Sequence, residues 1–184
     1  FRTGPLFTPP SLQGTVVRPG SVGGANWGGA AVDPETGMLY VPSRNGFSVS
    51  TLAAPDPKLE SNLQFMQVPG RSPRMPDGVP LFKPPYSRIT AIDMNSGDHR
   101  WMTPAGRGER VRALPPLKGL DLPALGGDST FSGPLLTKTA LFYALTTGGT
   151  TGGPRLVAYD KATGRELGST DLPGAAIGTP MTYQ

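Results

Sequence analysis

The chain has 184 residues, a formal net charge of +4 and a high content of glycine (26) and proline (22). It contains no cysteine, which excludes disulfides, thiol catalysis and thiolate-bound metals within these residues. It also contains no apolar run of about 20 residues, which excludes a transmembrane helix within this segment. Because glycine and proline interrupt long helices, the composition predicts an all-β, loop-rich chain.

The first distinctive segment, Gly23–Gly29 (GGANWGG), places four glycines around one amide and one indole. Glycine lets the backbone approach a ligand closely, Asn26 offers directional hydrogen bonds, and Trp27 offers a broad apolar face. Such a segment suits a flat ligand with polar edges. Composition alone nevertheless favours the alternative, in which the tryptophan covers the core beside a glycine-rich turn.

Three segments share one turn pattern, in which an apolar residue precedes Asp-x-x-Ser/Thr-Gly. They are Val32–Gly37, Ile92–Gly97 and Tyr159–Gly164, at spacings of 60 and 67 residues. Asp accepts hydrogen bonds from the backbone ahead of it, and Gly supplies the positive φ of a tight β turn. With strand-like runs beside them, the turns predict a repeated β unit, each turn at an equivalent place in successive blades. The alternative is that a common turn recurs three times by chance. In either case, the three Asp carboxylates are assigned to turn formation rather than to acid–base chemistry.

Isolated polar residues between these segments receive structural interpretations. Arg44 follows a strand-like run and can reach an acidic group of a ligand, but a surface-loop arginine is favoured. His99 has no second His or Cys at ligand spacing, so an exposed strand histidine is favoured over a metal ligand. Only Pro57–Val68 has a pattern that can hold a short helical turn.

Two loops later in the chain are also notable. Arg107, Arg110 and Arg112 lie in a loop without interleaved aromatic residues, which favours a solvated loop and predicts no nucleic-acid partner. Residues 126–134 (GGDSTFSGP) precede a strand-like run. This second glycine-rich segment is interpreted as the plain start of a blade, although it can also face a ligand.

The chain resembles a known family in three places. Residues 23–43 (GGANWGGAAVDPETGMLYVPS) resemble a segment of the quinoprotein dehydrogenases, and are most similar to the glucose and alcohol dehydrogenase-like branches. Residues 91–101 (AIDMNSGDHRW) are similar to the family's tryptophan-docking repeat, and residues 178–183 look like the start of a late blade. The resemblance covers most of residues 14–184.

The resemblance implies a fold and roles for a few residues. The family's fold is an eight-bladed β-propeller that binds pyrroloquinoline quinone (PQQ), so residues 1–184 are expected to form a single C-terminal fragment with about three to four blades. Asn26 would reach the polar edge of the quinone, and Trp27 would belong to the cofactor pocket. Trp101 would be structural, stacked between adjacent blades with its indole N–H bonded to backbone. Gly168 stands where the third repeat would carry its docking tryptophan, which leaves the docking of that blade open.

The activity implied by the resemblance is oxidation of a sugar or alcohol, with PQQ as electron acceptor and calcium as a second cofactor. The family's catalytic Asp, calcium ligands and basic residue at the quinone oxygens are expected in blades outside this chain. No catalytic or metal-binding residue is therefore assigned here, and the fragment alone is expected to be inactive.

The implied partners are the remainder of the propeller, a small sugar or alcohol and a respiratory-chain electron acceptor. The implied location is the periplasm or a periplasm-facing membrane. A non-catalytic propeller scaffold is the main alternative, and it explains Trp101 and the turns but not Gly23–Gly29. A carbohydrate-binding β module would use Trp27 as a sugar platform, but it leaves the spacing of the turns unexplained.

Overall fold

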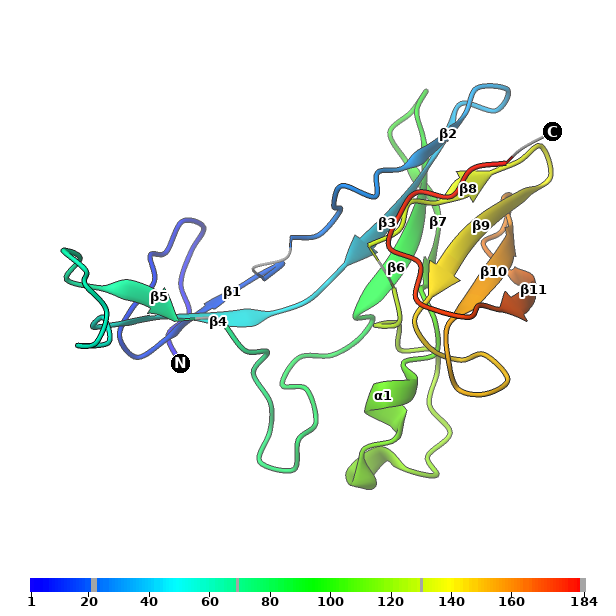
Figure 1. Ribbon diagram of the computed structural model, residues 1–184. Coiled ribbons are helices and arrows are strands. Elements are labelled where there is room, and N and C mark those ends of the chain that lie inside the picture. The colour runs from blue at the N-terminus through cyan, green and yellow to red at the C-terminus, as the bar shows by residue number, and fades with distance from the viewer. Residues whose placement is uncertain (21–22, 69, 130, 183–184) are drawn as a thin grey trace. The chain divides into compact units, whose positions relative to one another are not determined.

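The computed structural model describes residues 1–20, 23–68, 70–129 and 131–182 (Figure 1). They form two compact units, one with Phe1–Gly23 and Gly46–Phe82, the other with Gly24–Asn45 and Lys83–Gln184. In the part of the chain that is described, no helix is long and apolar enough to cross a membrane.

The unit that contains Phe1 is built on a three-stranded antiparallel sheet, ordered β1-β4-β5. Its strands are β1 (Thr15–Val17), β4 (Ser48–Ala53) and β5 (Met66–Val68). The sequence allows a short helical turn only within Pro57–Val68, but the short helices of the described structure lie elsewhere, as α1 (Glu109–Arg112) and a 3-10 helix (Pro115–Leu117) of the other unit. The segment begins with a turn, closed by the Leu59 N–H on the Asp56 carbonyl, and ends as β5. Pairing with β4 satisfies backbone groups that a helix would have bonded internally.

The other unit contains two four-stranded antiparallel sheets (Figure 1). The first sheet consists of β2 (Ala31–Asp33), β3 (Met38–Arg44), β6 (Ser87–Asp93) and β7 (His99–Pro104). The second consists of β8 (Leu135–Leu136), β9 (Ala140–Leu145), β10 (Arg155–Asp160) and β11 (Glu166–Asp171). Within each sheet the strands are ordered as they occur along the chain, although β4 and β5 of the unit that contains Phe1 lie between β3 and β6 in the sequence. Four-stranded meanders of this kind are the blades of a β-propeller. The described residues thus hold two complete four-stranded blades, where about three to four were expected.

The core of this unit lies between the two blades. Strand residues alternate between faces, so each blade presents one apolar face to the other. Tyr40, Ile89 and Ala91 from the first blade join Leu141 and Val157 from the second in one buried cluster. This shared core fixes the two blades against each other, and it therefore also fixes the loops at their ends.

The three Asp-to-Gly turns have the predicted chemistry. They join β2 to β3, β6 to β7 and β10 to β11. Each Asp carboxylate accepts a hydrogen bond from the backbone N–H two residues ahead, at 3.1, 2.9 and 2.7 Å respectively. Each closing Gly has a φ between 67° and 80° and donates its N–H to the Asp carbonyl. The assignment of these carboxylates to turn formation is confirmed.

The predicted equivalence of the three turns is wrong for one of them. The Asp93 and Asp160 turns both join the third and fourth strands of a blade, whereas the Asp33 turn joins the first and second strands of the first blade. The spacing of 67 residues therefore measures the blade repeat, and the spacing of 60 does not. An Asp-to-Gly turn fits any tight hairpin, so its chemistry alone does not fix its place in a blade.

Trp101, on the outer strand β7, docks the first blade onto the second. Its indole N–H donates to the Lys161 carbonyl at 3.1 Å, and its ring covers Gly164, where a Cβ would overlap the indole. The Tyr40 hydroxyl donates to the same carbonyl at 3.0 Å. The predicted docking between blades is confirmed, although the ring is half-buried rather than fully enclosed.

Gly168 occupies the place of the docking tryptophan in the second blade. It pairs with Ala158 across the outer strands, just as Trp101 pairs with Ala91. Among the described residues, no heavy atom lies within 4 Å of the position that a Cβ on Gly168 would take, apart from its chain neighbours. The predicted departure from the repeat therefore corresponds to an outer strand with no docking side chain at this point.

An ion pair between the half-buried Lys161 and the buried Asp33, beside the docking tryptophan, predicts acid sensitivity. The Lys161 ammonium lies 2.5 Å from the carboxylate of Asp33, and this hydrogen bond lowers the pKa of Asp33 below its ordinary value of 3.8. The folded state therefore gains stability from this carboxylate above pH 3.8 and loses it as the pH falls through the lowered pKa. Lys161→Met should reduce the drop in melting temperature between about pH 5 and pH 3. The exposed Lys138→Met is the control, and an equal drop in wild type and Lys161→Met would contradict the prediction.

Candidate functional site

The candidate site lies where the first strand of each blade begins. Because neighbouring strands are antiparallel, the loop before β2 and the end of β3 meet at one edge of the first blade. The loop before β8 approaches the same edge, because a Cβ on Gly28 would lie only 2.7 Å from the carbonyl oxygens of Phe131 and Ser132. The glycine of the Asn-Trp motif is thus required for the close approach of two loops.

A hollow opens between these loops. Its polar and aromatic lining residues are Asn26, Ser43, Arg44, Ser129, Phe131, Ser132 and Tyr143. The described lining contains an arginine, an amide, hydroxyls and aromatic rings, but no carboxylate. The chemistry of this lining suits the edge of a flat, negatively charged ligand, and the hollow, with a volume of about 20 Å³, has room for only a small part of such a ligand.

Asn26 lies in this hollow, and its own backbone sets its orientation. Its side-chain oxygen accepts a hydrogen bond from the Trp27 N–H at 2.8 Å, and its carbonyl accepts one from Gly29 at 2.9 Å. Gly29 has a φ of 73°, a conformation that glycine adopts without strain. These bonds form a tight turn that presents the half-buried amide to the hollow.

Trp27 points into an adjacent, more open hollow. Its side chain is 94% exposed, so it does not cover the core that the described residues form. Phe131, Ile177, Gly178 and Thr179 line this second hollow with it. The residues after β11 therefore reach the loops of both blades. Tyr183, the end of the segment predicted to start a late blade, lies outside the described residues.

The sequence favours a surface-loop role for Arg44, but in the structure this residue lines the hollow. It is the last residue of β3, and its Nη2–H donates to the Ser129 carbonyl at 2.6 Å. Its guanidinium carbon lies 4.2 Å from the centre of the Phe131 ring. The sequence signal for this position was weak, because Phe131 is distant along the chain and belongs to the next blade.

The glycine-rich segment 126–134 starts the second blade, as predicted, and it also supplies a wall of the hollow. Asp128 is buried, and its carboxylate accepts a hydrogen bond from the Gly108 N–H at 2.6 Å. Its carbonyl accepts bonds from the backbone and the hydroxyl of Thr146 at 2.7 and 3.0 Å. These bonds hold the segment that carries Ser129 and Phe131. Thr130 lies outside the described residues.

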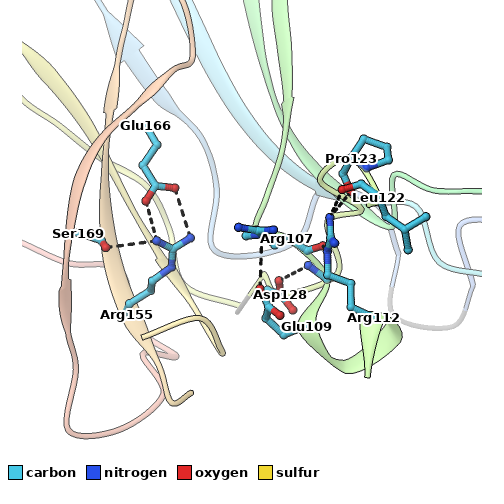
Figure 2. Close-up of polar contacts among 10 residues, drawn as sticks. Arg107, Glu109, Arg112, Leu122, Pro123, Asp128, Arg155, Glu166 and Ser169 are labelled. Atoms are coloured by element: carbon cyan, nitrogen blue, oxygen red, sulfur yellow. Dashed lines mark hydrogen bonds and ion pairs between the residues drawn. The ribbon is translucent and has the colours of Figure 1, made fainter. Parts of the chain in front are cut away.

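Other charged residues have structural roles away from the hollow. His99 is exposed at the start of β7, as expected. Arg112 departs from the expectation of a simply solvated loop, because it donates to the carbonyls of Arg107, Leu122 and Pro123 and closes its own loop (Figure 2). Arg155 forms an ion pair with Glu166 at 2.6 Å across the β10–β11 hairpin (Figure 2).

The described residues contain no group of three or more His, Cys, Asp or Glu side chains that could hold a metal ion. The expectation that calcium ligands lie outside this chain stays a prediction.

Comparisons with known proteins agree with this architecture. Quinoprotein glucose dehydrogenase from Escherichia coli K12 is 30% identical over 97% of the chain, and quinate/shikimate dehydrogenase (quinone) from Acinetobacter baylyi is 29% identical over 97%. The chain spans about a quarter (24%) of the length of each of these relatives. Quinohemoprotein alcohol dehydrogenase from Comamonas testosteroni matches in structure with a TM-score of 0.57 at 21% identity, over 92% of this chain and 22% of that one.

A family model described as the PQQ glucose/ethanol/alcohol dehydrogenase β-propeller domain matches residues 1–184. The two meandering blades and the docking tryptophan are the structural counterpart of this match. The chain therefore belongs to the PQQ-dependent glucose, ethanol and alcohol dehydrogenase family of β-propellers.

Proposed function

We propose that this chain is part of a quinoprotein dehydrogenase that oxidises a sugar or alcohol, and that it supplies one wall of the PQQ pocket. The observation that supports the proposal is the hollow in which Asn26 and Arg44 of the first blade meet Phe131 of the second. Its lining offers hydrogen-bond donors and an aromatic face. PQQ is a flat quinone with carboxylate groups, so these residue types fit it.

Each lining residue has a distinct task in this proposal. The Asn26 amide, oriented by its turn, would hold a polar edge of the quinone. The exposed Trp27 would form a rigid wall beside the cofactor and restrict the access of water. When bound, PQQ supplies the redox chemistry by accepting the electrons of the alcohol.

The remaining parts of the active site are proposed to lie in other blades. These parts are the base that removes the hydroxyl proton and the calcium ligands. We further propose that the complete protein passes electrons to an acceptor in the respiratory chain and that it has a periplasmic or periplasm-facing location. Both rest on the family resemblance, and fractionation of cells that produce the complete protein would test the location.

A non-catalytic propeller scaffold is the competing function. It would need the docking of Trp101, but it would not need a donor-lined hollow beside a glycine-rich loop. The exposed Trp27 also fits a sugar-binding platform. Direct measurement of cofactor binding separates these alternatives from the proposal.

Asn26→Ala should weaken PQQ binding by the complete protein about 5- to 160-fold, because a buried polar partner is left unpaired at a cost of roughly 1–3 kcal/mol. Equilibrium titration of cofactor-free protein with PQQ measures this change. Asn26→Asp can keep the oxygen that accepts the Trp27 N–H, but it loses the amide donors, so it should weaken binding at least as much while the turn stays intact.

The exposed Asn62→Ala is the matched control and should bind PQQ like the wild type. Unchanged affinity in both Asn26 variants would exclude Asn26 from the pocket. A wild-type protein that does not bind PQQ would favour the scaffold.

A further inference from the structure

Within the described residues, the guanidinium of Arg44 is held in place without a carboxylate partner. One of its N–H groups donates to the Ser129 carbonyl, and its central carbon lies over the Phe131 ring, 4.2 Å from the ring centre. Among the residues that the structure describes, no ion pair joins Arg44 to Asp or Glu. The side chain is half-buried at the hollow that Asn26 also lines.

An arginine in this setting is prepared to bind an anion. Guanidinium has five N–H donors, and its planar fork matches the two oxygens of a carboxylate. Stacking on Phe131 and the bond to Ser129 restrict the side chain, so less conformational entropy is lost when a ligand binds. A surface lysine would not offer this geometry.

We propose that Arg44 is a carboxylate-binding residue of the hollow and that it positions an acidic ligand beside Asn26. The inference rests on the proposed function, and the carboxylate belongs either to the bound PQQ or to an acidic hydroxyl-bearing substrate. Arg44 comes from the first blade and is anchored on the second. Correct pairing of the two blades is therefore a condition for correct placement of the charge.

The test uses the complete dehydrogenase with Arg44→Met, Arg44→Lys and a matched control. Arg18 also stacks on a phenylalanine, with its guanidinium carbon 5.4 Å from the Phe47 ring, but it does not line this hollow. Arg18→Met is therefore the control for loss of a stacked arginine. Melting temperatures show whether each variant is folded, and Arg44→Lys retains the charge if Arg44→Met does not fold.

The first arm titrates cofactor-free protein with PQQ and with its trimethyl ester, which lacks the negative charges. If the cofactor supplies the carboxylate, Arg44→Met should weaken binding of PQQ by about 10- to 100-fold, the range for a charge-assisted pair, and Arg44→Lys by less. Neither Arg44 variant should change the affinity for the ester, and Arg18→Met should change the affinity for neither ligand.

The second arm compares an acidic hydroxy acid with a neutral sugar in the loaded enzyme. If the substrate supplies the carboxylate, Arg44→Met should leave PQQ affinity unchanged and raise KM for the acid only. Folded Arg44 variants whose affinity for PQQ and whose KM for both substrates equal those of the wild type would overturn the inference. In that case the effect of Asn26→Ala still decides the proposed function separately, whereas a wild type that binds no PQQ would overturn both.

Discussion

Replacing Trp101 with Ala is expected to lower the free energy of unfolding by about 3 kcal/mol, the lower end of the range for loss of a large packed aromatic residue. The substitution removes the ring that covers Gly164 and the hydrogen bond to the Lys161 carbonyl. It also leaves Tyr40 as the remaining side-chain donor that the structure shows on that carbonyl. Because Trp101 connects the two blades, the loss should act on the unit as a whole.

Urea unfolding followed by far-ultraviolet circular dichroism measures this loss. Trp27→Ala is the matched control, since Trp27 is 94% exposed and should change stability by no more than about 0.5 kcal/mol. The stability loss of Trp101→Phe should lie between those of the other two variants, because this variant keeps an aromatic ring but loses the N–H donor. Equal stability of Trp101→Ala and Trp27→Ala would contradict the docking role.

Gly28→Val is expected to destabilise the protein by about 3 kcal/mol, at the upper end of the usual cost of overpacking. A Cβ at Gly28 would lie 2.7 Å from two carbonyl oxygens of the loop before β8, so backbone rather than a flexible side chain would have to move. The same displacement would separate Asn26 from Phe131. We therefore expect reduced PQQ affinity even in protein that remains folded.

Gly178→Val provides the comparison, because the described structure leaves open space around Gly178 and its φ lies outside the positive range. This variant should unfold at a urea concentration close to that of the wild type. A Gly28→Val protein with wild-type stability and wild-type PQQ affinity would show that the two loops do not need their close contact.

The local features of the blades could be predicted because they depend on neighbouring residues. The Asp-to-Gly turns follow from side-chain-to-backbone bonds over two residues and a positive φ at glycine. The docking role of Trp101 was implied by the resemblance of residues 91–101 to the family's tryptophan-docking repeat. The same turn chemistry could not tell the first hairpin of a blade from the last, which is why the Asp33 turn was misplaced.

The site could be predicted only in part, because it is assembled from two blades. Asn26 carried a local signal in its glycines, and it lies in the hollow. The local signal at Arg44 was weak, since its role depends on Phe131 in the following blade. Contacts between residues of different blades depend on how the blades pack and not on the spacing of the residues along the chain.

The most direct test of the proposed pocket is an experimental structure of the complete protein with PQQ bound. The account predicts a polar edge of the quinone at hydrogen-bond distance, about 3 Å, from the Asn26 amide. It also predicts that the ligand lies in the hollow between the loops before β2 and β8, beside the Phe131 ring. A quinone bound elsewhere, with Asn26 and Phe131 both out of contact, would contradict the assignment of this hollow as the cofactor pocket.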